Sequence, residues 1–272
     1  VMKYLDKSLQ LYKKLGDKRN IAYVLTNKSM VLEKDYINEA IEISLEVLKI
    51  REEINDQLGL SYSLGGLASL YISKYDFKKA IKYNSKSQAI KEKLGSKWGL
   101  ILSFRKYAQI HICKGEYDKA EEYCTQALKL SENISNVYLM SDSYFYMGVI
   151  LERKCDYEAA IQYYEKSIQV YSDEFDDEDL LEINSRINNL LKKMNKNFNN
   201  NEIIKLIEKV PNSNFRLYFI LYQLLEDRIY LKKAYNQVQE KADNLEPDIK
   251  IKFLGYPIPK TIIEEYNKVF KK

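Results

Sequence analysis

Histidine is nearly absent from this 272-residue sequence, in which His111 is the only example. A catalytic triad or a metal cluster built on histidines is therefore excluded within these residues. Cysteine is scarce as well, and Cys113, Cys124 and Cys155 are odd in number and widely spaced. Disulfide frameworks belong mostly to small secreted chains, so we expect three small packing residues in a reduced, cytoplasmic protein, without a metal site.

Glycine and proline number only 9 and 4. Both residues supply the backbone angles of tight turns, so their scarcity argues against a sheet-rich fold. Lysine, glutamate, leucine and alanine, which favour helices, are abundant instead. The composition predicts an all-α fold.

Neither sign of charge dominates, since 43 basic and 39 acidic residues give a net charge of +4 that is spread along the chain. Nucleic-acid binders usually gather basic residues on one face, so we expect no direct nucleic-acid partner. The charge-free stretch from Leu58 to Ser73 is interrupted by serines and two glycines. It is shorter than the roughly 20 apolar residues of a membrane span, so we expect no membrane partner either.

Self-similarity with a period of 40 residues organises most of the chain. Four alanines stand 40 residues apart, and apolar residues at helical spacing follow each of them. An acidic-aromatic pair precedes each alanine, and the helix before that pair carries a small residue that lets two antiparallel helices approach closely. The alanines are Ala40, Ala80, Ala120 and Ala160; the pairs are Asp35-Tyr36, Asp76-Phe77, Glu116-Tyr117 and Asp156-Tyr157; the small residues are Ala68, Ala108 and Gly148.

Two further signals mark where helices end. Leu15-Gly16-Asp17 recurs at the same phase as Leu94-Gly95-Ser96. Glycine can take the left-handed conformation that ends a helix, and Asp17 or Ser96 can then cap the next one. The run from Met2 to Tyr12 also superimposes on Ile161 to Tyr171, which places Val1 at the alanine position. We therefore expect a fragment of a longer protein, whose first repeat lacks its first helix.

These residues resemble the tetratricopeptide repeat, in which a small residue in the first helix faces an alanine that opens the second. The 40-residue period is similar to the longer-helix subclass found in signalling scaffolds and large bacterial regulators. The resemblance covers residues 1–195, with local departures at Asn27 and at Tyr36 to Glu39. It implies an all-α solenoid of helical hairpins, closed by a helical C-terminal capping region over residues 196–272.

The tail departs from the period. Its acidic start, Asp176 to Asp179, suits a helix N-terminus, and an asparagine run around Asn199 predicts a break. We expect helices over Leu180–Met194, Glu202–Lys209, a long one from Phe215, and Lys260–Lys271 after Pro257 and Pro259. The stretch from Lys241 through Phe253 to Pro257, with Ile262 and Ile263, is similar to the closing segment of bacterial STAND ATPases, in which a cyclase or kinase domain and an ATPase precede tetratricopeptide repeats.

No constellation of catalytic residues is present. The run from Asp173 to Asp179 lacks the ligand pattern of an EF-hand loop, and Gly65-Gly66 is not followed by the Gly-Lys-Ser/Thr of a phosphate-binding loop. His111 stands where the preceding repeat has Tyr71, which favours packing over ligand binding. We expect a protein that is not an enzyme and that binds no cofactor.

In the resembled family the first helices line a concave face that binds ligands. That resemblance implies a mixed apolar and polar stripe suited to a peptide or helix, centred on Arg105 and Gln109 with apolar contact from Ile112 and Phe145. An acidic peptide or an acidic helix of the parent protein would suit the Arg105 guanidinium. Alternatively, the face is solvated or covered by another part of the parent. The ligand-binding residues expected are Lys28, Ser69, Ile72, Arg105, Gln109, Ile112, Phe145, Val149 and Glu152.

The resemblances imply a non-catalytic protein- or peptide-binding module at the C-terminal end of a larger bacterial signalling ATPase. Its partners would be proteins or peptides, including other domains of the parent. The alternative is a peptide-sensing repeat domain of a transcription regulator that has a separate DNA-binding part. A phosphate-binding loop upstream of Val1 would favour the first interpretation, and a helix-turn-helix the second.

Overall fold

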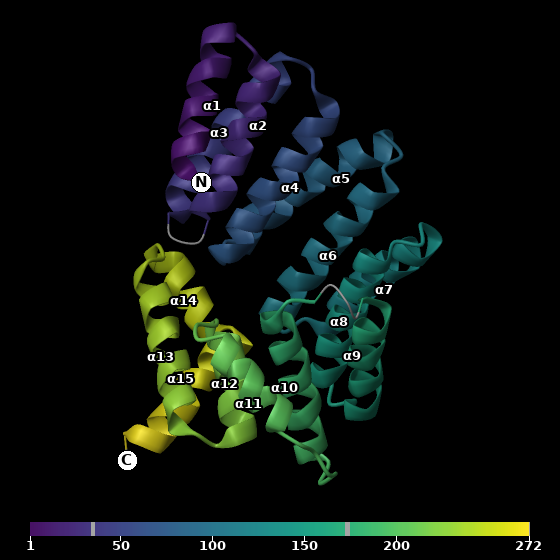
Figure 1. Cartoon of the computed structure of the whole chain (residues 1–272), viewed down its shortest axis with the longest axis vertical. Coiled ribbons are helices and arrows are strands. Elements are labelled where there is room, and N and C mark those ends of the chain that lie inside the picture. The colour runs from purple at the N-terminus through teal and green to yellow at the C-terminus, as the bar shows by residue number, and fades with distance from the viewer. Residues whose placement is uncertain (34–35, 172–174, 272) are drawn as a thin grey trace. The chain divides into compact units, whose positions relative to one another are not determined.

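The computed structural model describes residues 1–33, 36–171 and 175–271, and it confirms the all-α prediction. Fifteen helices and no strand occur in this part of the chain (Figure 1). The chain forms two compact units, Val1–Ile110 and His111–Lys272, and each is described by itself. Of the sequence features discussed above, Asp35 and the pair Asp173-Glu174 lie outside the described residues.

Nine helices form the repetitive part of the chain. The first helices of the hairpins are α2, α4, α6 and α8, and the second helices are α3, α5, α7 and α9 (Figure 1). The paired helices α2 and α3, α4 and α5, and α8 and α9 pack on each other. The bounds are α1 Met2–Leu15, α2 Lys18–Leu32, α3 Ile37–Glu53, α4 Gln57–Ser73, α5 Phe77–Lys93, α6 Lys97–Lys114, α7 Tyr117–Asn133, α8 Val137–Arg153 and α9 Tyr157–Tyr171.

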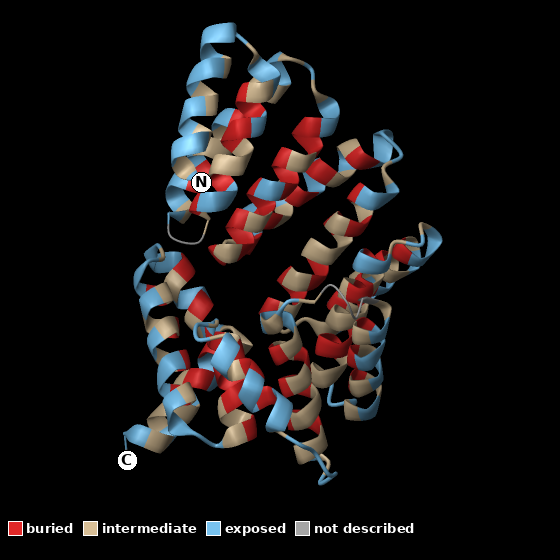
Figure 2. Ribbon diagram, viewed as in Figure 1, coloured by how far each residue is buried: buried red, intermediate tan, exposed pale blue. Residues whose placement is uncertain are grey.

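The repeating alanines lie where close packing requires them. Ala40, Ala80, Ala120 and Ala160 are all 0% exposed, which confirms their predicted burial. Figure 2 shows that buried and exposed residues alternate along the helices of the repeats. The small residue opposite them is just as constrained in the last hairpin. A Cβ atom added to Gly148 would lie 2.6 Å from Cε1 of the buried Tyr164 ring. No side chain at all can be accommodated there without movement of a neighbour.

The predicted helix ends are confirmed. Gly16 ends α1 with φ of 67°, and Gly95 follows α5 with φ of 64°, both in the left-handed region that glycine tolerates. The next residues cap the following helices: the Asp17 carboxylate accepts a hydrogen bond from the Asn20 amide at 3.1 Å, and the Ser96 hydroxyl accepts one from the Gly99 amide at 3.2 Å. These caps satisfy amides that a helix start leaves without partners.

The tail contains six helices rather than four. They are α10 Asp177–Lys193, α11 Asn201–Lys209, α12 Phe215–Leu225, α13 Arg228–Asp243, α14 Pro247–Gly255 and α15 Pro257–Phe270. Helix α12 packs on α10, and α13 packs on both α12 and α15. The division at residue 195 and the truncation of the first repeat stay predictions; α1 itself has no buried residue.

Two predictions about the tail are wrong. The long helix expected from Phe215 is broken, because Glu226 takes a left-handed conformation with φ of 60° and the Asp227 carboxylate caps α13 by accepting from the Ile229 amide at 2.9 Å. The last helix begins at Pro257 rather than Lys260, because proline fits the first turn of a helix, where no amide hydrogen is needed.

The cysteines differ in their surroundings. Within the described residues none of the three forms a disulfide bond, and Cys113 and Cys124 are buried, as expected of packing residues. Cys155 is exposed and has φ of 63° in the turn after α8, so the prediction that it packs in the core is wrong. Across the described residues, no helix has the length and apolar character needed to cross a membrane.

Candidate functional site

The predicted ligand-binding residues all lie on first helices, but they are divided between the two units. Lys28 lies on α2, Ser69 and Ile72 on α4, and Arg105 and Gln109 on α6, all in the first unit. The second unit holds the other four: Ile112 at the end of α6, and Phe145, Val149 and Glu152 on α8.

In the first unit, most of the predicted residues have some access to solvent. The Lys28 ammonium lies 3.0 Å from the Asp6 carboxylate, and its side chain is 20% exposed. The Ser69 hydroxyl donates to the Gly65 carbonyl at 3.3 Å. Gln109 is half-buried, whereas Ile72 is buried in the core. Their binding role stays a prediction.

A small cleft in the first unit lies next to Ser69. It has a volume of about 250 Å³ and is bounded by α2, α3 and α4. The Ser29 hydroxyl at its edge donates to the Ala40 carbonyl at 2.9 Å and lies 2.7 Å from the Ser44 hydroxyl. The sequence pattern identified Ser69 but not the α3 side chains Ser44 and Val47, which also line the cleft. Both of these side chains lie on a second helix, whereas the predicted binding surface included first helices only.

In the second unit, Glu152 belongs to an internal network of charges. Its carboxylate lies 2.8 Å from Nη1 of Arg186 on α10 and accepts a hydrogen bond from the Tyr164 hydroxyl at 2.7 Å. The Arg186 guanidinium also donates to Glu182 through Nε and Nη2, at 3.0 and 2.8 Å. The side chains of Glu152 and Arg186 are only 8% and 4% exposed, so both charges are nearly removed from water.

The electrostatics of this network favour the ionised carboxylate. Burial by itself would raise the pKa of Glu152, but the Arg186 guanidinium and the Tyr164 hydroxyl hold that pKa below its ordinary value. Burial and the neighbouring Glu152 carboxylate raise the pKa of the Tyr164 hydroxyl, so it remains a hydrogen-bond donor. The Glu152 carboxylate is therefore already engaged within the protein.

Phe145 and Val149 lie beside the same network. The Arg186 guanidinium stands 5.8 Å from the centre of the Phe145 ring, and Val149 packs with Ile183 and Leu190 of α10. Helix α10 thus covers this part of the predicted surface. The sequence held one signal for it: Arg186 stands at the apolar phase of α10, between Ile183 and Leu190, where a charge needs a buried partner.

His111 packs as the sequence predicted. Its ring is stacked on that of Tyr123 at 5.5 Å, and Nδ1 lies 2.6 Å from the Glu116 carboxylate. Hydrogen bonding from Lys114 and His111, opposed by partial burial, lowers the pKa of Glu116 to about 2. Within the described residues, no group of three or more histidine, cysteine, aspartate or glutamate side chains could hold a metal ion.

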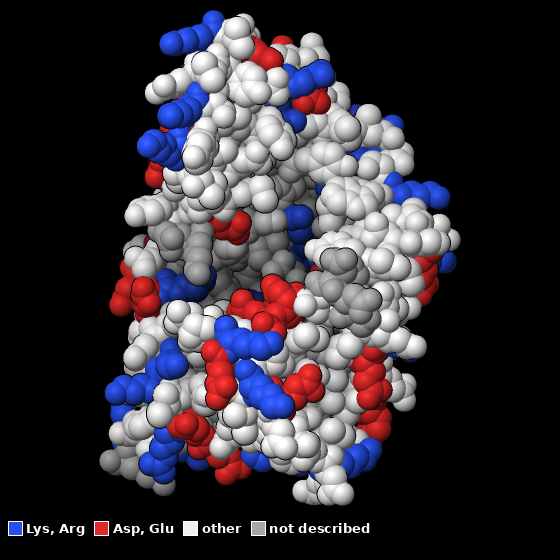
Figure 3. Space-filling model, viewed as in Figure 1, with Lys and Arg blue, Asp and Glu red and all other residues white. Residues whose placement is uncertain are grey.

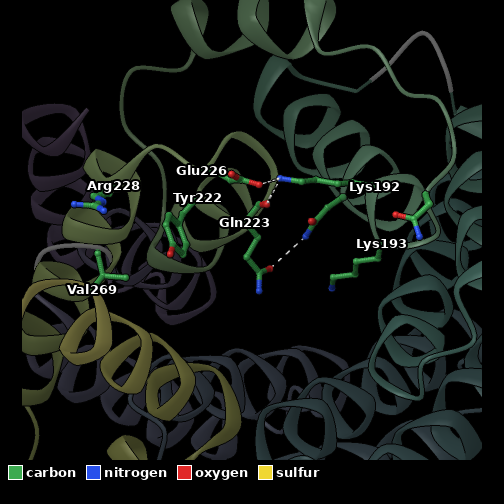
Figure 4. Close-up of a pocket in the computed structure, with 9 residues that line it drawn as sticks. Lys192, Lys193, Tyr222, Gln223, Glu226, Arg228 and Val269 are labelled. Atoms are coloured by element: carbon green, nitrogen blue, oxygen red, sulfur yellow. Dashed lines mark hydrogen bonds and ion pairs between the residues drawn. The ribbon is translucent and has the colours of Figure 1, made fainter. Parts of the chain in front are cut away.

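A larger cleft, which we call the basic cleft, lies in the second unit between the end of α10 and the helices α12, α13 and α15. Its volume is about 680 Å³, and Figure 4 draws the side chains that line it. No sequence pattern indicates this cleft, because its residues come from three separate parts of the tail. They are Asn189, Lys192, Lys193, Asn195, Tyr222, Gln223, Glu226, Arg228 and Val269.

The outer surface of the second unit carries both signs of charge. In Figure 3, lysine and arginine side chains alternate with aspartate and glutamate over the visible face of the second unit. Exposed ion pairs in this unit include Lys209 with Asp177 at 3.0 Å and Lys250 with Asp243 at 2.7 Å. Exposed pairs of this kind contribute little to stability.

The fold defines a class: this is an all-α protein built of repeated helical hairpins. Residues 100–188 match the tetratricopeptide repeat family, so this segment is similar to repeats that serve as protein-interaction modules. No curated protein matches the sequence.

Solved structures share the fold at low sequence identity. BtubC (BKLC) from P. vanneervenii is 17% identical with a TM-score of 0.62, and the match covers 80% of this chain and 88% of that one. RapI is 14% identical with a TM-score of 0.58, covering 98% of this chain and 81% of its own. A kinesin light chain-like repeat protein from Podosopora anserina is 14% identical with a TM-score of 0.51, covering 75% and 95%. These likenesses concern the fold alone.

Proposed function

We propose that this chain is a non-catalytic protein- or peptide-binding module whose binding surface lies on the first helices of its repeats. The observation that carries the proposal is the 40-residue hairpin repeat, with its alanines fully buried and residues 100–188 matching the tetratricopeptide family. Such a repeat exposes one helix face after another and leaves side chains free to select a partner. Arg105 and Gln109 on α6 are the centre of the proposed surface in the first unit.

The contacts described above narrow the set of predicted residues that can bind a partner. Glu152 and Val149 are occupied by α10, and Phe145 supports Arg186. The proposed surface in the first unit therefore depends on Lys28, Ser69, Arg105 and Gln109. An acidic peptide, or an acidic helix of the parent protein, suits the basic members of this group.

The proposal extends to the parent protein. The resemblance of the tail to STAND ATPases supports a role as the C-terminal sensor of a larger bacterial signalling ATPase. The coding sequence upstream of residue 1 tests this part of the proposal. A phosphate-binding loop there supports the ATPase, and a helix-turn-helix in its place would instead support the transcription regulator.

A calorimetric titration with the other domains of the parent tests the binding surface. We expect Arg105→Ala and Gln109→Ala each to weaken binding by about 1–3 kcal/mol, the range for a lost hydrogen bond to a charged group. Lys82→Ala, an exposed lysine on the second helix α5, is the matched control and should bind as wild type. Loss of binding in Lys82→Ala with both α6 variants unaffected would contradict the proposed surface.

A further inference from the structure

The basic cleft contains more cationic side chains than its own hydrogen bonds engage. Lys192 is fully engaged: its ammonium donates to the carbonyls of Gln223 and Leu224 at 3.2 and 3.0 Å and to the Glu226 carboxylate at 2.6 Å. It thereby caps the C-terminal end of α12, a favourable place for a cation. Lys192 and Glu226 cancel each other in charge and hold α10 against α12.

The remaining two cations of the cleft have no such partner. The Lys193 ammonium lies 5.7 Å from the centre of the Tyr157 ring. Within the described part of the chain, no carboxylate forms an ion pair with Lys193 or Arg228. The charged side chains that line the cleft, Lys192, Lys193, Arg228 and Glu226, therefore carry a net charge of +2.

Amide side chains also line the basic cleft. The Asn189 side chain donates from Nδ2 to Gln223 Oε1 at 3.2 Å, which fixes the Gln223 amide so that its Nε2 is available as a donor. In Figure 4, Arg228 and Tyr222 lie on one side of Gln223 and Lys193 on the other. An extended ligand with two anionic groups can meet a cation on each side of this amide.

We propose that the basic cleft is a second binding site, and that it takes an acidic peptide segment bearing at least two carboxylates. Arg228 offers the planar set of donors that suits a carboxylate, and Lys193 offers a second cation. Gln223 can hydrogen-bond the peptide backbone between them, and Val269 supplies apolar contact. The volume of about 680 Å³ lies within the range of about 300–1,000 Å³ typical of ligand sites.

This site goes beyond the proposed function, since none of the residues predicted from the repeats lines the basic cleft. It also does not depend on that function. The first-helix surface of the first unit is carried by α2, α4 and α6, and the basic cleft by α10, α12, α13 and α15. Substitutions can therefore impair either site alone.

Fluorescence anisotropy with a labelled, end-blocked tetraglutamate peptide tests the proposal on the full chain. We expect saturable binding that weakens as salt is added, because the contacts are ionic. Arg228→Gln and Lys193→Gln should each reduce the affinity about tenfold, the fold-change expected when a charged hydrogen bond is lost. Lys232→Gln, an exposed lysine on α13 outside the cleft, is the matched control and should change the affinity less than about twofold.

Three results would overturn the proposal. If tetraglutamine binds as tightly as tetraglutamate, the carboxylates of the peptide play no role in binding. Inorganic phosphate displacing the peptide at comparable concentration would show a site for a single anion. Loss of tetraglutamate binding in Gln109→Ala, with Arg228→Gln and Lys193→Gln both unaffected, would assign the acidic ligand to the first-helix surface instead. Circular dichroism of each variant checks that its helices are intact.

Discussion

At the scale of single residues, the size of a side chain matters most where two helices meet. Gly148 on α8 faces Tyr164 on α9, and the space between them is smaller than a methyl group requires. Gly66 on α4 is also helical, but a Cβ atom there would meet nothing within 4 Å. The same residue type therefore has opposite roles at these two positions.

This contrast makes a prediction for paired substitutions. We expect Gly148→Ala to destabilise the fold by about 1–3 kcal/mol, since the Tyr164 ring is fully buried and cannot move aside without strain. Gly66→Ala should instead stabilise it by up to about 1 kcal/mol through helix propensity. Urea unfolding of both variants measures the difference. A Gly148→Ala protein as stable as Gly66→Ala would show that α8 and α9 pack less closely than described.

A second residue-scale prediction concerns the repeating alanines. Ala80 and Ala120 have no exposed surface, so Ala80→Leu or Ala120→Leu must push two helices apart. Each should cost about 1–3 kcal/mol or more, whereas serine at either position should be far better tolerated. Thermal unfolding of the leucine and serine variants makes the comparison. Leucine variants that melt with the serine variants would contradict close packing at these positions.

Lys91 is a buried cation on α5 with weak compensation. It is 1% exposed, donates to the Ser103 hydroxyl at 3.1 Å, and its ammonium lies 5.7 Å from the centre of the Tyr62 ring. Burial lowers the pKa of Lys91 to about 8. Between that value and the ordinary pKa near 10.5, the unfolded chain binds a proton that the folded chain does not, so folding stability contributed by this group rises with pH.

We therefore expect Lys91→Met to remove both the free-energy cost of burying this charge and the pH dependence of folding stability that the charge causes. Below a pH of about 8 the lysine is charged in both states and the full penalty is present, up to about 3 kcal/mol. Lys91→Met should raise stability at neutral pH and flatten the rise between neutral and mildly alkaline pH. Urea unfolding at about pH 7 and pH 9.5 measures both effects. An identical pH dependence in wild type and variant would rule out Lys91 as its source.

At the scale of elements, α10 is held to the last hairpin by a buried charge network rather than by apolar contact alone. Arg186 has carboxylate partners on its own helix and on α8. Removing one partner leaves the arginine incompletely compensated in the interior, whereas replacing both by apolar residues removes the charges together. The network thus makes the position of α10 sensitive to a single substitution.

This reasoning predicts the outcome of a double-mutant cycle. We expect Glu152→Leu to destabilise the fold by about 3 kcal/mol, and Glu152→Leu combined with Arg186→Met to recover most of that loss. The lowered pKa of Glu152 means that its contribution is present above the ordinary value of 4.5 and is lost as pH falls through the lower folded value. Chemical unfolding at neutral and acidic pH measures both effects. A double variant no better than Glu152→Leu would contradict a coupled pair.

At the scale of the whole molecule, the helices after residue 195 complete the packing of α10. Helix α12 lies against it, and Lys192 reaches from α10 to the end of α12. An open end of a helical repeat leaves an apolar face in water. We expect truncation after Met194 to cause aggregation or a marked fall in thermal midpoint, measured by calorimetry and light scattering. A monomeric truncation with an unchanged midpoint would identify the tail as a separate module.

The repeated hairpins and the ends of their helices could be predicted from sequence patterns. The spacing of Ala40, Ala80, Ala120 and Ala160 is periodic, and the glycine and acidic signals at Gly16 and Asp17 act within one turn of the chain. Local interactions of this kind depend on neighbours in sequence, so a pattern in the sequence is sufficient to identify them.

The surroundings of the predicted binding residues could not be predicted in this way, because they depend on contacts between distant parts of the chain. Glu152 meets Arg186 across 34 positions of sequence, and Lys192 meets Glu226 across the same separation. The basic cleft likewise draws its residues from α10, α12, α13 and α15. Such contacts follow from how helices without a common period pack on one another. The break at Glu226 could not be predicted from the sequence either. Glu226 takes the left-handed conformation although it is neither glycine nor asparagine, and it divides what the sequence presents as one long helix.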